Sequence, residues 1–150
     1  MQLHYEFTYS AQLKQALNVG AGPYGARMVF EVVGGTVQGN RLNGTVLGGG
    51  ADWMLVGPDG CGRLDVRAQF STKDNAVVYM SYFGVVEMNG AVQQAVAAGG
   101  ETQFGDQYFR TAPRLETGDP RYAWVNQSLF VAEGRFLPGP GVEYNVHRVG

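Results

Sequence analysis

The chain has few of the side chains that form disulfides, zinc sites or charge-driven interfaces. Its 150 residues include one cysteine, Cys61, and two histidines. A lone cysteine excludes an internal disulfide, so a reducing, cytoplasmic location is expected. The same scarcity leaves no zinc-ligand spacing, so no metal is expected. A net charge of −2 and 16% charged residues predict no nucleic-acid partner, and no apolar run has membrane-spanning length.

Glycine, in contrast, is abundant, with 23 residues scattered between short apolar runs. Strict alternation dominates these runs, as in "LHYEFTY" and "ARMVFEVV", and it predicts half-buried strands. The only helical pattern is residues 89–100, "NGAVQQAVAAGG", which ends at glycine. We therefore expect one domain, residues 1–150, with an all-β fold. The expected fold is a closed antiparallel β-barrel of about eight to ten strands with one short helix. Closure would make His4 and His147 neighbours, because they lie in the first and last strands.

A glycine pattern near the N-terminus matches the spacing of a dinucleotide-binding loop. Gly20, Gly22 and Gly25 read G-x-G-x-x-G within "VGAGPYGA". That site needs a helix after the glycines, so that the helix N-terminus meets the phosphates. Here the next residues are "ARMVFEVV", which predict a strand. We therefore interpret the glycines as a tight loop, and no cofactor is expected.

The turn "GPDGCG" predicts a hairpin whose register gathers polar side chains on one face. Pairing Leu55 with Leu64 and Trp53 with Val66 keeps apolar residues together. The same register, continued through the "STKDNA" turn, pairs Gln69 with Tyr79 and Arg67 with Ser81. It predicts one face carrying Asp52, Asp65, Arg67, Gln69, Tyr79 and Ser81. If this face points inward it forms a polar pocket, and if it points outward it is a solvated surface.

A second polar and aromatic set lies in "YFRTAPRLETGDPRYAWVNQSLF". Tyr108 and Arg110 share one side of a predicted strand. Tyr122, Trp124 and Asn126 share one side of the next predicted strand, after a loop that contains Glu116. Aromatic rings with an arginine and an amide suit the mouth of a pocket for a planar or cyclic molecule. The alternative is that the two rings belong to the core.

Four phrases together resemble the DUF3237, or UPF0311, family. They are "GAGPYGAR", "GGTVQGNRLNGTVLGGGADW", "PDGCGRLDVRAQFSTKDNAVVYMSYFG" and "QYFRTAPRLETGDPRYAWVNQSLFVAEGR". The resemblance implies a compact antiparallel β-barrel, of the calycin or allene oxide cyclase type, and it transfers no reaction because the family's function is unknown. The family pattern often has tyrosine at Gln69, which weakens any mechanism that needs a phenol there. The family motifs draw attention to Arg41, Asp52, Trp53, Asp65, Arg67, Tyr108, Arg110, Glu116, Tyr122, Trp124 and Asn126.

Three functional hypotheses follow. The first is a cofactor-free isomerase, cyclase or dehydratase that acts on a small aromatic or polyketide-like compound by acid/base chemistry. Its catalytic residues would be Asp52 or Asp65 as base, Tyr79 or Tyr108 as acid, and Arg67 or Arg110 as the partner of developing negative charge. Its ligand-binding residues would be Arg41, Trp53, Glu116, Tyr122, Trp124 and Asn126. The second hypothesis is a non-catalytic ligand carrier, and the third is a structural homo-oligomer.

Overall fold

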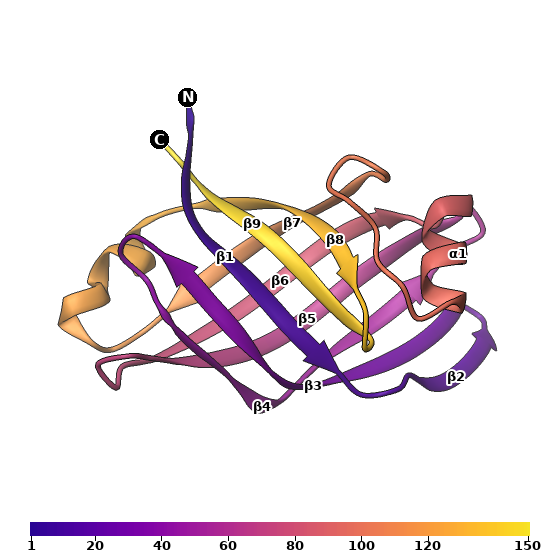
Figure 1. Cartoon of the computed structure of the whole chain (residues 1–150), viewed down its shortest axis with the longest axis horizontal. Coiled ribbons are helices and arrows are strands. Elements are labelled where there is room, and N and C mark those ends of the chain that lie inside the picture. The colour runs from indigo at the N-terminus through magenta and orange to yellow at the C-terminus, as the bar shows by residue number, and fades with distance from the viewer.

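A computed structural model describes residues 1–150 as nine strands, one α-helix and one 3-10 helix (Figure 1). The strands are β1 (Leu3–Leu13), β2 (Leu17–Gly22), β3 (Gly25–Gly39), β4 (Gly44–Val56), β5 (Cys61–Thr72), β6 (Val77–Glu87), β7 (Phe109–Glu116), β8 (Phe130–Leu137) and β9 (Gly141–Val149). The helices are α1 (Gly90–Ala97) and the 3-10 helix η1 (Pro120–Gln127). No helix is long and apolar enough to span a membrane.

Eight of the strands close into an antiparallel barrel, which confirms the expected fold. The sheet order is β1-β9-β8-β7-β6-β5-β4-β3-β2, and β1 also pairs with β3 to complete the ring. The extra strand, β2, pairs only with β3. Closure brings the first and last strands together, with Tyr5 opposite His147 and His4 opposite Arg148. The two termini accordingly lie side by side at one end of the barrel (Figure 1).

Alternation along each strand sends apolar side chains into the barrel and polar ones outward. On β5, Leu64, Val66, Ala68 and Phe70 are buried, and the odd-numbered residues between them face outward. The core is a single cluster of 24 buried residues drawn from all eight barrel strands, with Leu42 and Val125 added from the connections. An antiparallel barrel with a mostly apolar interior and a polar exterior follows from this period of two.

The two ends of the barrel are closed differently. Helix α1 lies at one end beside β2, and η1 lies at the other (Figure 1). Helix α1 matches the predicted segment: the Asn89 side chain accepts a hydrogen bond from the Val92 N–H at its start. The predicted strand that carries Tyr122, Trp124 and Asn126 is wrong, because a helix occupies these residues. The Asp119 side chain caps η1 and Pro120 occupies its first turn, so these two residues start a helix there.

The first predicted hairpin register is wrong by one residue, because its loop is longer than a two-residue turn. Gly57 N–H donates to Cys61 O, so the loop contains three residues, and Gly60 has a φ of +77°. Leu55 therefore lies opposite Arg63, and Asp52 lies opposite Val66. Because side chains alternate between the two faces of a sheet, a register slip of one residue changes which side chains of the two strands share a face. Asp52 consequently points into the barrel with Val66, away from Asp65 and Arg67.

The glycine pattern at residues 20–25 forms the tip of a β-hairpin, as the loop interpretation predicts. Gly22 lies opposite Gly25 at the turn between β2 and β3. Strand β3 then runs for 15 residues, and no helix follows the glycines. The segment therefore has no helix N-terminus to offer to a pyrophosphate.

Candidate functional site

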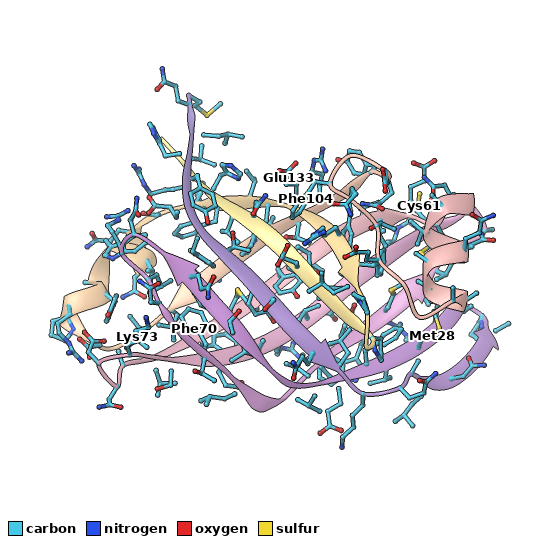
Figure 2. All side chains as sticks on the ribbon, in the orientation of Figure 1. Met28, Cys61, Phe70, Lys73, Phe104 and Glu133 are labelled. Atoms are coloured by element: carbon cyan, nitrogen blue, oxygen red, sulfur yellow. The ribbon has the colours of Figure 1, made fainter.

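A cavity of about 450 Å³ opens at the α1 end of the barrel. Its walls come from the inward side chains of β3 to β7 and of β8 and β9, and its mouth lies between α1, the β8–β9 turn and the segment after β1. Figure 2 shows Met28, one of the lining residues, toward the α1 end, and Phe70 toward the opposite end. The apolar lining includes Met28, Phe30, Met54, Leu64, Val86, Met88, Phe109, Phe136, Leu137 and Val142.

Asp52 is the only charged side chain that lines this cavity, and Gln15 is its only other lining residue with a polar side chain. Asp52 is 8% exposed. It lies in a row across adjacent strands, between Phe30 on β3 and Val66 on β5. Its one hydrogen bond comes from the Asp65 N–H, which donates to Oδ1 at 3.2 Å. A carboxyl group is thus held in an apolar cavity with no lysine, arginine or histidine among the lining residues.

This environment changes the acidity of Asp52. Burial raises its pKa from the usual 3.8 to about 7, the Asp65 N–H bond opposes that rise, and the negative charge of Asp65 adds to it. Both protonation states are therefore populated near neutral pH. A carboxyl group with such a pKa is suited to take up and return a proton at neutral pH.

Three buried tyrosines pack together in the barrel interior, next to the cavity. Tyr9 of β1 lies opposite Tyr144 of β9, with their rings stacked at 5.8 Å between centroids. Tyr82 of β6 meets Tyr144 edge-on at 5.4 Å and Tyr9 at 6.4 Å. Tyr144 also packs edge-on against Phe109, which lines the cavity. The sequence reasoning missed this cluster. The available signal was a tyrosine hydroxyl at an inward position of an alternating strand.

The other members of the predicted polar face lie on the outer wall of the barrel. The second hairpin register is confirmed, with Gln69 opposite Tyr79 and Arg67 opposite Ser81. Asp65 is half-buried on this outer face, and Arg67 and Tyr79 are exposed there. Trp53 also faces outward, and the Arg67 guanidinium lies 6.0 Å from its ring centroid. The polar face is therefore a solvated wall, and Asp52 is the member that faces the interior.

Tyr108 and Arg110 share the outer side of the barrel as well. The Arg110 guanidinium lies 5.3 Å from the Tyr108 ring centroid, and both residues are exposed. They border a shallow depression over Gly84, next to Phe83 and Arg63. Neither residue lines the internal cavity.

The remaining predicted residues gather at the η1 end. The Arg41 guanidinium lies over the Trp124 ring, 3.6 Å from its centroid, and donates to both carboxylate oxygens of Glu6. The Tyr122 hydroxyl donates to Asp74 at 2.7 Å.

The last two predicted residues, Asn126 and Glu116, lie near the same end of the barrel. The Asn126 side chain exchanges two hydrogen bonds with the backbone of Thr117, and Glu116 is exposed on β7 opposite Tyr79. The predicted strand face of Tyr122, Trp124 and Asn126 is wrong, because η1 replaces that strand. Together with Arg41, these residues fasten η1 over the barrel end, and the cavity opens at the opposite end.

The twelve predicted site residues thus divide by location, and only Asp52 lines the cavity. No group of three or more histidine, cysteine or acidic side chains comes together in a way that could hold a metal ion. The chemistry that the cavity offers is therefore that of one carboxyl group in apolar surroundings.

Comparisons with known proteins show what this barrel is similar to. The family model described as "Protein of unknown function (DUF3237)" matches residues 1–149. A UPF0311 protein of Rhodopseudomonas palustris is 34% identical over 131 residues, which are 87% of this chain and 86% of that protein. A UPF0311 protein of Clostridium acetobutylicum is 31% identical over 140 residues, covering 91% and 89%.

Solved structures of other proteins have the same fold. A conserved protein of unknown function from Rhodopseudomonas palustris superimposes with a TM-score of 0.91 at 32% identity, covering 99% of this chain and 97% of that one. A barrel described as an enzyme, from Penicillium herquei, has a TM-score of 0.66 at 20% identity, covering 99% and 96%, which is a likeness of fold. The chain belongs to the DUF3237, or UPF0311, family.

Proposed function

We propose that this protein binds a small, largely apolar organic molecule in the barrel and moves a proton on it with Asp52. One observation carries the proposal: a single buried carboxyl group lies in an otherwise apolar cavity of about 450 Å³. Burying an ionisable group without a charged partner is costly, so such groups concentrate at functional sites. The volume lies in the range of small-molecule pockets.

The chemistry follows from the protonation state of Asp52. In its ionised form the carboxylate accepts a proton from an acidic C–H or O–H of the bound molecule. In its neutral form it returns that proton to another atom of the same molecule. The net result is an isomerisation or cyclisation with no change in oxidation state and no cofactor. Dehydration fits the same scheme, because a protonated carboxyl group can deliver its proton to a leaving hydroxyl.

A non-catalytic carrier is the second candidate, and one feature of the cavity favours it. Apart from Asp52, the only polar side chain in the lining is Gln15. Acid/base enzymes usually add a hydrogen-bond donor that stabilises the developing negative charge. A carrier needs only the apolar walls and one polar anchor. The two functions therefore differ in turnover, and both require binding.

The experiment uses 1-tetralone, a neutral bicyclic ketone whose α-hydrogens exchange slowly with solvent. Saturation-transfer NMR measures whether it binds, and proton NMR in deuterium oxide measures exchange of its α-hydrogens. We expect the wild-type protein to bind the ketone and to accelerate exchange. Asp52→Asn should retain binding and lose at least a hundredfold of the acceleration, the usual scale of general-base catalysis.

The matched control is Asp65→Asn, which removes a carboxylate on the outer side of the same wall. It should keep most of the exchange activity, because Asp65 does not line the cavity. Binding without acceleration would leave the carrier as the function. Equal acceleration by wild type and Asp52→Asn would refute the role of Asp52.

A further inference from the structure

The three tyrosine hydroxyls below the cavity have no assigned role in the proposed proton transfer. Tyr9, Tyr82 and Tyr144 are 1%, 5% and 2% exposed. They come from three strands and meet in the middle of the barrel, with ring centroids 5.4 to 6.4 Å apart. The buried Tyr9 hydroxyl makes no hydrogen bond within 3.5 Å, although the Tyr82 hydroxyl is near enough to lower its pKa against the larger effect of burial. Such an orphaned donor costs free energy unless another polar group or a water satisfies it.

Asp52 lies beside this cluster. Asp52, Val66 and Tyr82 are successive partners across β4, β5 and β6, and all three point inward. Two strand spacings put about 10 Å between the Cα atoms of Asp52 and Tyr82, a gap that the two converging side chains narrow. Burial is the main cause that raises the pKa of each of the three tyrosines, and the charge of Asp52 raises it further.

The cavity lining offers Asp52 no cation, and its one other polar side chain is that of Gln15. The inward neighbours of Asp52 on β3 and β5 are apolar: Met28, Phe30, Leu64 and Val66. Besides the tyrosines on β1, β6 and β9, Thr111 of β7 is a buried polar residue on the inward face. Asp65 is the nearest other charge; it donates its N–H to Oδ1, and Oδ2 makes no hydrogen bond with the protein.

We propose that Tyr9, Tyr82 and Tyr144 are positioning residues that hold Asp52 from below, with the Tyr9 hydroxyl donating to the Asp52 carboxylate through one buried water. A buried water needs two to four polar partners, and the three hydroxyls and Oδ2 supply them. This inference concerns Asp52, the acid of the proposed function. Only the catalytic role of the network rests on that function. The network would orient the carboxyl group and stabilise its ionised form.

The change Tyr9→Phe separates this network from simple packing, because it removes the hydroxyl and keeps the ring. A donor to the ionised carboxylate lowers the pKa of Asp52, so its loss raises that pKa by about one unit. If the Tyr9 hydroxyl instead bonds nothing, its removal leaves the pKa of Asp52 unchanged and raises the melting temperature, because an unsatisfied polar group is gone.

The experiment follows the carboxyl carbon of Asp52 by carbon-13 NMR between pH 4 and pH 9, with Asp52→Asn assigning the signal. Tyr9→Phe and Tyr144→Phe are measured in parallel, so that the test survives if one variant fails to fold. Tyr24→Phe, at a residue 80% exposed, is the matched control. The network predicts an upward shift in Tyr9→Phe and none in the control.

An unchanged titration in both buried variants would overturn the network, and a gain in the stability of Tyr9→Phe would show that its hydroxyl bonds nothing. Because the titration uses no substrate, its result is independent of the exchange assay. A shifted pKa without ketone exchange would refute the proposed function and keep the network. Exchange of the ketone hydrogens without a shift in the pKa of Asp52 would refute the network and support the proposed function.

Discussion

Replacing Asp52 with asparagine should change how the stability of the barrel depends on pH. The pKa of Asp52 is about 7 in the folded protein, against 3.8 as its usual value. The folded state therefore holds this proton more tightly than the unfolded chain does. Its contribution to stability is fully present below about pH 4 and is lost as the pH rises toward 7. Above pH 7 the penalty of the buried charge is constant.

The size of the effect follows from the two pKa values. Each unit of difference corresponds to about 1.4 kcal/mol. Linkage between an unfolded pKa near 3.8 and a folded pKa near 7 gives a stability loss of about 3 kcal/mol between pH 4.5 and pH 8.5. The amide introduced by Asp52→Asn keeps an acceptor for the Asp65 N–H and carries no charge, so the variant should lack this loss. The new N–H₂ group also needs hydrogen-bond partners, which affects the variant's stability at every pH. The informative quantity is therefore how the difference in unfolding free energy between wild type and variant changes with pH.

The assay is urea unfolding of wild type, Asp52→Asn and Asp65→Asn at half-unit steps from pH 4.5 to pH 8.5. The free energy of unfolding of Asp52→Asn should gain about 3 kcal/mol relative to wild type across this range. Asp65→Asn should keep most of the wild-type pH dependence, with a smaller loss, because the charge of Asp65 adds less than burial does to the raised pKa of Asp52. Parallel profiles for wild type and Asp52→Asn would show that Asp52 is not a buried acid of raised pKa.

Three further predictions address the packing, the η1 end and the outer wall. A Cβ at Gly134 would lie 2.8 Å from Tyr144 Cε1 and 2.9 Å from the Phe109 ring, so Gly134→Ala should cost about 1–3 kcal/mol of unfolding free energy. Gly118→Ala, where a Cβ meets nothing within 4 Å, is its control, and equal costs would contradict the packing. Glu6 is buried between Arg41 and Arg148, whose hydrogen bonds keep its pKa below the usual 4.5 despite the opposing effect of burial. Glu6→Gln should therefore lower the free energy of unfolding by about 1–2 kcal/mol at pH 7. Thermal unfolding should show this difference from wild type shrinking as the pH falls below about 4. A difference that stays constant with pH would argue against the ion pairs. Phe83 is 73% exposed in the middle of the outer wall, and if the expected homo-oligomer forms through this wall, Phe83→Ser should shift sedimentation velocity toward the monomer. An unchanged sedimentation coefficient would remove this wall as the contact.

The sequence predicted the fold class because the barrel depends on a local and repeated signal. Alternation along β5 separates Leu64, Val66 and Phe70 from the outward residues between them, and the same period recurs in the other strands. The β5–β6 register was also predictable, since the turn at Asp74–Asn75 gives one pairing and Asn75 accepts a φ of +67°. The missed 3-10 helix had a local signal too, in the capping residue Asp119 followed by Pro120.

The candidate site depended on features that local patterns do not contain. The three-residue loop over 58–60 set the β4–β5 register, which places Asp52 in one inward row with Val66 and leaves Asp65 and Arg67 outside. Tyr9, Tyr82 and Tyr144 are far apart in the chain and meet only because the ring of strands closes. The sequence by itself determined which residues alternate and therefore that a closed β-barrel forms. The tertiary structure decided which polar side chains are withdrawn from water, because burial depends on strand register and closure, and burial is what raises the pKa of Asp52.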